Sequence, residues 1–372
     1  MKTIAFYLPQ FHEVEENSKW WGEGYTEWVS VREAKPLYPG HYQPEEPLHD
    51  YYYDLTDPET LMWQAELARE NGVYGFCFYH YWFSRKLILE KPAELLLKHK
   101  EIDIHFCFSW ANETWKRTWS RDEGNSWNAL HDEGMLKKTQ SVLLKQEYGD
   151  REEWYDHFMY LLPFFEDERY IKVDNKPMLL LYKPRDIKCL NTMMKLWNQL
   201  AVEHGYDGLY IIATNDCDIQ NPYIEANAVF EPAYMIRHPG KKESMADDYI
   251  HKKRETGKKI PLVYSYRRAW KKILNRELLG TRKTFLGGFV NFDKTPREGK
   301  NALLYIGTSP RRFKKYFKQL VQKGIGQNLE FVFLNAWNEW GEGAHLEPDK
   351  KHGMKYLNAV KEVMEEMEED FF

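Results

Sequence analysis

The chain has 372 residues, of which 43% are hydrophobic and 16% aromatic, and 52 Lys and Arg against 57 Asp and Glu give a formal net charge of -5. This balance argues against a strongly basic nucleic-acid surface, and no run of about 18 apolar residues occurs, so no membrane span is expected. The 14 Trp and 25 Tyr exceed what a core requires and suggest ring-lined grooves.

The N-terminal residues and the cysteines indicate a reducing compartment. Met1 to Thr3 lead directly into an apolar strand, without the h-region or cleavage site of a secretory signal. The four cysteines are scattered, and Cys77 and Cys107 lie inside apolar runs, which fits buried free thiols better than disulfides or a metal cluster. We therefore expect a cytoplasmic protein with no metal and no other cofactor.

Apolar runs of strand length recur along the chain, each followed by polar and aromatic residues. The first run ends at Pro9 and opens a long aromatic loop to Asp57, which we expect to form a wall of a binding site. The second and third runs end in Tyr79-His80-Tyr81-Trp82 and in Trp110-Ala111-Asn112-Glu113. The predicted strands cover residues 3–8, 73–78, 102–108, 178–182, 209–213, 228–230, 285–292 and 329–334.

Helical segments separate these strands. Asp57-Pro58 predicts a capped helix that runs to Glu70, and Ser309 with Pro310 predicts another N-terminus. Residues 170–176 predict a hairpin, and residues 262–266 are an extra strand or part of a loop. Further helices are predicted over residues 90–99, 151–168, 190–204, 238–260 and 355–369, with a polar insertion over residues 120–150.

Eight strands with intervening helices indicate a parallel α/β architecture. The functional-looking residues follow the carboxyl ends of the strands, as in the active site of a (β/α)8 barrel. A doubly wound sheet is the alternative, but no G-x-G-x-x-G follows the first strand. We predict that residues 1–372 form one (β/α)8 barrel domain with long βα loops.

The stretch after the last strand, from Leu334 to Pro348, reads L-N-A-W-N-E-W-G-E-G-A-H-L-E-P. Indole rings offer flat apolar faces to a sugar, and carboxylates exchange protons with hydroxyls or with a glycosidic oxygen. Glu339 and Glu342 can point into one cavity if the loop makes about one turn, and glycosidases commonly need two such groups. A structural loop with a buried ion pair and aromatic packing is the alternative.

Side chains at other strand ends are candidates for contacting a sugar, with packing at the rim as the alternative. Asp216-Cys217-Asp218 spells D-x-D, which holds a metal in nucleotide-sugar glycosyltransferases, but this spacing arises readily by chance. The candidate sugar-contacting residues are Glu27, Trp28, His80, Trp82, Trp110, Asn112, Glu113, Trp337 and Asn338.

Five motifs occur in order along the chain and together resemble the WbsX-type proteins. These proteins are found with bacterial surface-polysaccharide genes and are related to glycoside hydrolase family 99. The resemblance covers nearly the whole chain and implies a (β/α)8 barrel that cleaves internal α-mannosidic linkages with retention and without a metal. The motifs are Tyr7-Leu8-Pro9-Gln10-Phe11-His12, Gly24-Tyr25-Thr26-Glu27-Trp28, Phe78-Tyr79-His80-Tyr81-Trp82, Trp110-Ala111-Asn112-Glu113-Thr114-Trp115 and Trp337-Asn338-Glu339-Trp340-Gly341-Glu342-Gly343.

By this resemblance Glu339 deprotonates the 2-hydroxyl of the sugar, which attacks C1 to give a 1,2-anhydro sugar. Glu342 protonates the leaving oxygen and later activates water. The sequence departs from the family 99 pattern at Gly341, where those enzymes have a larger residue.

The resemblance thus predicts an endo-acting, α-mannosidase-like hydrolase whose partner is an oligosaccharide or polysaccharide. Two alternatives stay open. One is a glycosyltransferase or processing factor in O-antigen or capsule (lipopolysaccharide) biosynthesis, and the other is a non-catalytic glycan-binding barrel.

Overall fold

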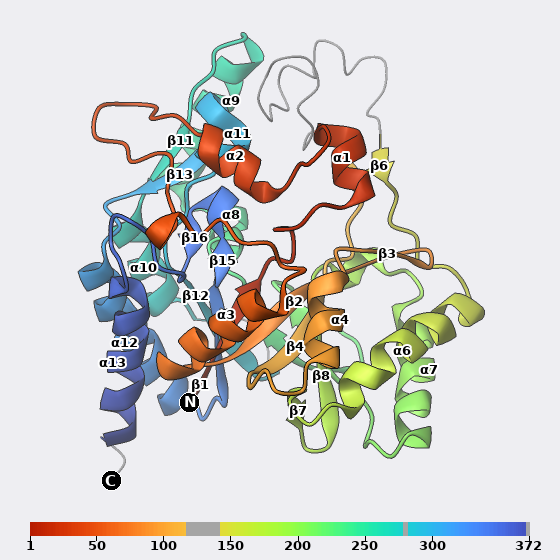
Figure 1. Ribbon diagram of the computed structural model, residues 1–372. Coiled ribbons are helices and arrows are strands. Elements are labelled where there is room, and N and C mark those ends of the chain that lie inside the picture. Colours follow the sequence, from red (N-terminus) through yellow and green to blue (C-terminus); the bar gives the residue numbers. More distant parts are fainter. Residues whose placement is uncertain (117–141, 278–281, 370–372) are drawn as a thin grey trace.

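The computed structural model describes residues 1–116, 142–277 and 282–369, and at its centre is a closed barrel of eight parallel strands (Figure 1). β1 closes the barrel because it pairs in parallel with both β2 and β14. The predicted (β/α)8 architecture is confirmed. The barrel strands are β1 (Lys2–Tyr7), β2 (Val73–Phe83), β4 (His105–Trp110), β8 (Lys176–Leu181), β9 (Tyr210–Thr214), β10 (Ile224–Ala228), β12 (Thr284–Phe289) and β14 (Phe331–Asn335).

Two barrel strands differ most in extent from the prediction. β2 continues to Phe83, and its far end forms a hairpin with β3 (Lys86–Ile88), so residues 79–82 belong to a strand rather than to a loop. The sixth strand, β10, ends at Ala228, where the predicted strand began. Its sequence IEANA carries Glu225 and Asn227, and these polar residues hide it from a search for apolar runs.

The segment between β10 and β12 adds structure outside the barrel. β11 (Leu262–Ser265) pairs in parallel with β13 (Leu303–Ile306) in a separate two-stranded sheet, which resolves the open question at residues 262–266. Trp270 is fully buried in the helix that follows and stacks on Phe289 and Tyr316, so this helix packs against the barrel. Of the insertion predicted at 120–150, residues up to 141 lie outside the described part.

The predicted helix starts and the hairpin turn are confirmed. Asp57 accepts a hydrogen bond from the backbone N–H of Glu59 (3.0 Å), and Ser309 accepts one from Arg312 (3.4 Å). Residues 174–175 turn the hairpin between β7 (Lys172–Val173) and β8 with positive φ angles. The helices are α1 (Glu15–Trp21), α2 (Glu27–Glu33), α3 (Pro58–Glu70), α4 (Lys91–Lys98), α6 (Arg151–Glu166), α7 (Leu190–Glu203), α8 (Ala233–Arg237), α9 (Lys241–Glu255), α10 (Tyr266–Asn275), α11 (Thr295–Glu298), α12 (Pro310–Gly326) and α13 (Lys355–Glu369).

Aromatic side chains fill the interior of the barrel. The ring of Phe6 on β1 lies 5.7 Å from that of Phe333 on β14 and 4.7 Å from that of Phe230, which follows β10. Burying a side chain of this size contributes about 1.5–3 kcal/mol. The barrel is therefore closed below this layer, and a ligand site must lie above it, at the carboxyl ends of the strands.

The long segment from Pro9 to Asp57 lies over that end of the barrel. It folds into α1 and α2, coloured red at the top of Figure 1, and α2 packs on α11 and on the short helix η5 (Trp340–Glu342). Trp28 of α2 contacts Trp340 with ring centroids 5.5 Å apart. The beginning and the end of the chain thus meet above the barrel.

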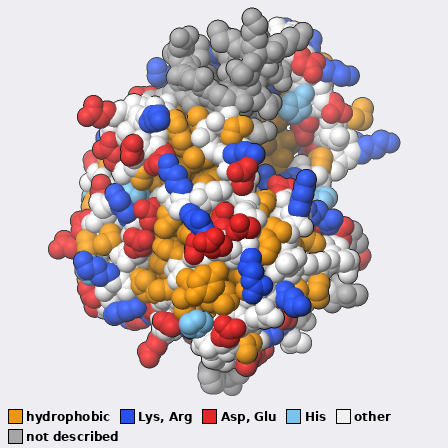
Figure 2. Space-filling view, turned by 90° about the vertical axis from the view of Figure 1, so that its right-hand side faces the viewer, with side chains coloured by type: hydrophobic (Ala, Val, Ile, Leu, Met, Phe, Trp, Pro, Cys, Tyr) orange, Lys and Arg blue, Asp and Glu red, His pale blue; other side chains and the backbone are white. Residues whose placement is uncertain are grey.

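The face of the molecule shown in Figure 2 mixes charges of both signs. On the face shown in Figure 2, Lys and Arg side chains alternate with Asp and Glu, with hydrophobic side chains between them. Within the described residues, no helix is long and apolar enough to cross a membrane.

Candidate active site

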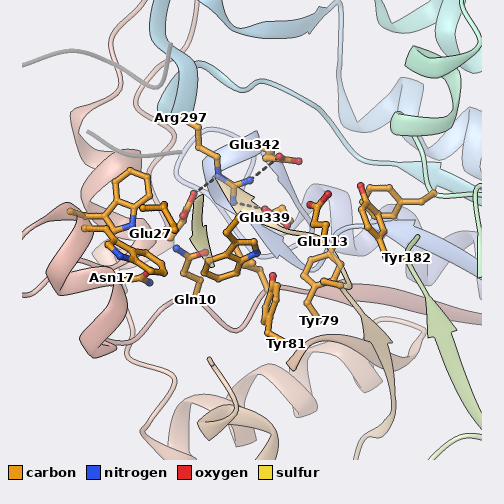
Figure 3. Close-up of a pocket in the computed structure, with 17 residues that line it drawn as sticks. Gln10, Asn17, Glu27, Tyr79, Tyr81, Glu113, Tyr182, Arg297, Glu339 and Glu342 are labelled. Atoms are coloured by element: carbon orange, nitrogen blue, oxygen red, sulfur yellow. Dashed lines mark hydrogen bonds and ion pairs between the residues drawn. The ribbon is translucent and has the colours of Figure 1, made fainter. Parts of the chain in front are cut away.

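A pocket opens at the carboxyl ends of the barrel strands (Figure 3). Residues from the first long segment form one wall, as predicted, and Phe230 from the top of the barrel core lies at its base. The lining residues are Leu8, Gln10, Asn17, Trp20, Trp21, Glu27, Tyr79, Tyr81, Ala111, Glu113, Trp115, Leu143, Tyr182, Phe230, Arg297, Glu339 and Glu342.

Glu339 and Glu342 lie on the loop that follows β14, which we call the carboxylate loop (residues 336–348). Glu339 ends β15 (Asn338–Glu339), Glu342 ends η5, and β15 pairs with β16 (Ala344–His345). Gly343 lies between η5 and β16 and reverses the chain direction with φ +60°, a conformation that other residues adopt only with strain. This tight hairpin puts both carboxyl groups into the pocket, as the three-residue spacing predicted.

Arg297, from α11, joins the acidic residues of the pocket (Figure 3). Its Nη2 donates to Glu339 Oε2 (2.8 Å) and its Nη1 to Glu342 Oε1 (2.7 Å). Its Nε donates to Glu27 Oε1 (2.6 Å), so the guanidinium bonds a different carboxylate with each nitrogen. Lys294 lies one helical turn away and, of Glu339 and Glu342, approaches only Glu342, with Nζ 3.3 Å from Oε1.

These contacts give the two glutamates opposite protonation behaviour. Burial, together with the charges of Glu342 and Glu27, raises the pKa of Glu339 to about 8 despite its contact with Arg297. Burial also acts on Glu342, but Lys294 and Arg297 outweigh it and lower the pKa of this carboxyl below its usual value. These opposite pKa shifts favour the proton of the pair on Glu339 rather than on Glu342.

Gly341 makes this arrangement possible. A Cβ atom at this position would lie 1.7 Å from Glu27 Oε1 and 2.8 Å from Arg297 Nε. The ion pair between Glu27 and Arg297 thus occupies the space that a side chain would need. This contact explains why the chain has glycine at position 341.

Aromatic residues form the other walls of the pocket. Tyr79 and Tyr81 project into it from β2, and Trp20 of α1 meets Trp115 edge to face at 6.0 Å. Glu113 lines the opposite side, where its Oε2 lies 2.5 Å from Lys183 Nζ. Flat rings beside carboxylates suit the C–H faces and hydroxyls of a sugar.

Four of the predicted site residues line the pocket together, namely Glu27, Glu113, Glu339 and Glu342. The other seven lie outside it, for reasons that their contacts make clear.

His80, Trp82 and Trp110 point away from the pocket, toward the helices that cover the barrel. Because β2 continues through residues 79–82, alternate side chains face opposite sides, and Tyr79 and Tyr81 take the pocket side. All three residues contact His157 of α6: His80 by an Nε2–Nε2 hydrogen bond (2.8 Å), Trp82 by stacking at 4.4 Å and Trp110 edge to face at 4.8 Å. Their positions assign them to packing.

Asn112 and Asn338 hold backbone segments together. The amide of Asn338 donates to the carbonyl of Leu8 (3.0 Å), and its oxygen accepts from the N–H of Leu8 (2.7 Å), which ties the carboxylate loop to β1. Asn112 makes the same pair of bonds with the backbone of Lys183 (2.8 Å each). Both amides are therefore already satisfied.

Trp28 and Trp337 belong to the hydrophobic core. Trp28 is 4% exposed and donates its ring N–H to the carbonyl of Tyr53 (2.8 Å). Trp337 is fully buried and lies 4.9 Å from the ring of Phe76.

Sequence reasoning missed several pocket residues. Arg297 stands in Thr295-Pro296-Arg297 after the seventh strand, but nothing in that motif shows that it meets three carboxylates from other elements. Tyr79 and Tyr81 belong to a recognised motif, and only their neighbours in it were chosen. The period of two along a strand is the signal that would have selected them.

Another buried carboxyl group, that of Glu347, supports the carboxylate loop. Glu347 Oε2 accepts hydrogen bonds from the ring N–H of Trp340 (2.6 Å) and from the hydroxyl of Tyr53 (2.7 Å), and Oε1 accepts one from Gln64 (2.6 Å). Burial raises the pKa of Glu347 to about 7, although these bonds favour its ionised form. Trp340, which lies between the two pocket glutamates in sequence, is thereby fixed.

The D-x-D aspartates lie away from the pocket. Asp216 and Asp218 each accept a hydrogen bond from Arg185 (2.7 Å), so a cationic side chain already occupies the position between them. Among residues 1–116, 142–277 and 282–369, no cluster of three or more His, Cys, Asp or Glu side chains could hold a metal ion.

The fold places the chain among the (β/α)8 barrels. Its backbone is similar to that of the GH99 endo-α-mannosidase from Bacteroides thetaiotaomicron, with a TM-score of 0.55 and 15% identity over 99% of this chain and 97% of that one. The same enzyme in complex with Bis-Tris-propane gives a TM-score of 0.56 at 14% identity. A glycoside hydrolase-like protein gives 0.55 at 13%, over 98% and 93% of the two chains.

The particular family follows from the sequence. Residues 3–360 match the model of the family described as Glycosyltransferase WbsX, and the chain belongs to this family. Two curated relatives, both called uncharacterized protein WxcX, come from two strains of Xanthomonas campestris pv. campestris. Each is 31% identical over 371 residues, which are 97% of this chain and 49% of the relative. The chain thus spans about half the length of these relatives.

The packing at Gly341 predicts the effect of adding one methyl group. Gly341→Ala must displace the carboxylate of Glu27, and we expect it to lower the free energy of unfolding by about 1–3 kcal/mol, as overpacking does. Urea denaturation measures the change. Gly326→Ala is the matched control, because a Cβ there meets no atom within 4 Å. Equal stability of the two variants would contradict the packing described.

The raised pKa of Glu339 predicts how stability depends on pH. The folded-state pKa is about 8, whereas an unfolded chain has about 4.3, so between these values the folded state binds more protons. The stabilisation is complete below the lower value and is lost as the pH rises through the higher one. Glu339→Gln removes this titration and should flatten the decline in unfolding free energy between about pH 5 and pH 8. Identical pH slopes for the variant and the wild type in urea denaturation would refute the assignment.

Proposed function

We propose that the chain is a glycan-active enzyme, a retaining glycoside hydrolase that resembles endo-α-mannosidases and cleaves an internal linkage of a bacterial polysaccharide. One observation carries the proposal. Glu339 and Glu342 lie three residues apart, are buried, line the same aromatic pocket and share the guanidinium of Arg297. The likeness of the barrel to a GH99 endo-α-mannosidase supports it.

The single proton held by this pair is what acid–base chemistry requires. Glycoside cleavage needs one group that accepts a proton and one that donates a proton to the leaving oxygen. Enzymes separate these roles by giving two neighbouring carboxyls different environments. Here Lys294 makes the two environments differ, because it contacts Glu342 and not Glu339, and before substrate binds it favours the proton on Glu339.

We assign to Glu339 the removal of the proton from the 2-hydroxyl, and to Glu342 the protonation of the leaving oxygen. O2 attacks C1, the bond from C1 to the leaving oxygen breaks, and a 1,2-anhydro sugar forms. Water then attacks C1 while Glu342 takes its proton, and Glu339 returns a proton to O2. O2 and then water attack C1 from opposite faces, and the two successive inversions retain its configuration.

This route requires the proton to move from Glu339 to Glu342 when the substrate binds, because the empty pocket has the reverse distribution. Arg297 bonds both carboxyl groups, so it remains paired with an ionised carboxylate before and after the transfer. With Arg297 present, the free energy difference between the proton on Glu339 and the proton on Glu342 is therefore smaller than it would be with Lys294 alone.

A glycosyltransferase is the second candidate, because the description of the family contains that word. A nucleotide-sugar donor brings a diphosphate, which requires free cations or a metal. Among the described residues, Arg297 in the pocket wall and Lys183 and Lys294 next to it are each paired with a carboxylate. The D-x-D aspartates lie outside the pocket and bond Arg185. These charges favour hydrolysis.

The proposal predicts that Glu339→Gln and Glu342→Gln each lower turnover of α-linked manno-oligosaccharides by about 10²–10⁴-fold, the usual contribution of a general acid or base. Product release is measured by chromatography, and circular dichroism checks that each variant is folded. Asp216→Ala is the control and should retain wild-type turnover.

Wild-type turnover in either glutamine variant would disprove the assignment. Sugar transfer from a nucleotide sugar that needs Mn²⁺ and is lost in Asp216→Ala would instead establish the transferase. Glycan binding without turnover on any linkage would identify a non-catalytic barrel.

The roles of the two glutamates predict how Lys294→Met changes the pH profile. Loss of this cation raises the pKa of Glu342, since one of the two charges that stabilise its ionised form is gone. If Glu342 is the acid, it stays protonated to a higher pH, and the basic limb of the profile of kcat/KM moves upward. The measurement uses the oligosaccharide that the wild type cleaves. A rise of the acidic limb would reverse the roles.

A further inference from the structure

Asn17 lines the pocket, and its carboxamide has no partner in the described part of the chain. The residue lies on α1 and is 1% exposed, and neither Oδ1 nor Nδ2 makes a hydrogen bond to another described residue (Figure 3). A buried amide without partners loses its bonds to water and gains nothing in return. A ligand that makes hydrogen bonds to this amide would explain why an unpaired polar group lies in the pocket wall.

A comparison with the other buried asparagines shows which unpaired amide lies at the pocket. Asn112 and Asn338 are also buried, but backbone groups satisfy both ends of their amides. Asn301 and Asn335 lack partners as Asn17 does, yet neither lines the pocket. Of the described asparagines with an unpaired amide, Asn17 is thus the one that a ligand in this pocket can reach.

The neighbours of Asn17 indicate what kind of ligand this is. Trp20 and Trp21 are on the same helix, and Trp20 contacts Trp115 edge to face, so that these rings form one part of the pocket wall. Indole rings offer apolar faces to the C–H surface of a pyranose. A carboxamide offers a donor and an acceptor side by side, which matches two adjacent hydroxyl groups.

The charges of the pocket indicate that the sugar is neutral. Its described lining contains four glutamates, namely Glu27, Glu113, Glu339 and Glu342, and one cation, Arg297. The Nε, Nη1 and Nη2 atoms of Arg297 each donate a hydrogen bond to a carboxylate. A uronic acid or a phosphate would therefore meet acidic groups without a free cation to bind it.

We propose that Asn17 is a specificity residue for a neutral pyranose, whose two adjacent hydroxyl groups bond its carboxamide while the ring lies against the tryptophans of this wall. The inference rests on the proposed function for the presence of a glycan in the pocket. It adds the sugar class and the residue that selects it.

Stability provides the first test, because it needs no ligand. Asn17→Ala removes an unpaired buried amide, so the urea midpoint should stay at the wild-type value or rise. Asn112→Ala leaves the backbone N–H and C=O of Lys183 unpaired, so its midpoint should fall. A fall of the Asn17→Ala midpoint as large as that of Asn112→Ala would overturn the proposal, because Asn17 would then serve the fold.

Binding provides the second test. A panel of neutral disaccharides, with uronic-acid disaccharides beside it, is titrated calorimetrically into the Glu339→Gln protein, which prevents turnover. We expect a neutral member to bind, and Asn17→Ala in this background to weaken that binding by about tenfold, the effect of losing two hydrogen bonds. Asn301→Ala is the matched control, since it removes an unpaired amide outside the pocket and should bind as the parent does.

The outcomes separate this inference from the proposed function. Unchanged affinity in Asn17→Ala, tighter binding of uronic acids, or no binding by any neutral sugar would overturn the inference, even if the wild type hydrolyses a glycan. Weaker binding in Asn17→Ala would support it even if the wild type turns over no glycan.

Discussion

The site depends on one buried guanidinium that bonds three carboxylates. Arg297 comes from α11, Glu27 from α2, and Glu339 and Glu342 from the carboxylate loop, so a single side chain joins three segments that are far apart in sequence. Unpaired charges at this depth would cost several kcal/mol each. The three segments therefore hold their positions together, and the spacing between the two pocket glutamates follows from the geometry of the guanidinium.

Around this centre, polar groups that do not face the pocket maintain the geometry of those that do. Asn338 ties the carboxylate loop to the backbone of β1, and Glu347 holds the indole of Trp340. Gly341 provides the space in which Glu27 and Arg297 meet. Most residues in the W-N-E-W-G-E-G segment thus support the two glutamates rather than contact a ligand, although all of them look functional in the sequence.

The barrel, all eight strands in outline and the acidic pair could be predicted, because buried strands are apolar and active sites of such barrels follow their carboxyl ends. β10 was misplaced because Glu225 and Asn227 interrupt its apolar pattern. Among the site residues, His80 and Trp82 were chosen in place of Tyr79 and Tyr81, since a strand was assumed to end where it continues. Arg297 could not be chosen, because its partners come from distant segments and pairing at such distances leaves no local pattern.

The pocket has one wall from the first segment of the chain and another from the loop after the last barrel strand. At synthesis rates of about 5–20 residues per second, Glu27 leaves the ribosome some tens of seconds before its partner Arg297. The barrel is closed by β1 and β14 at the same late moment. Until Arg297 has been made, Glu27 lacks this partner, and a chain without β14 and the carboxylate loop has no complete pocket.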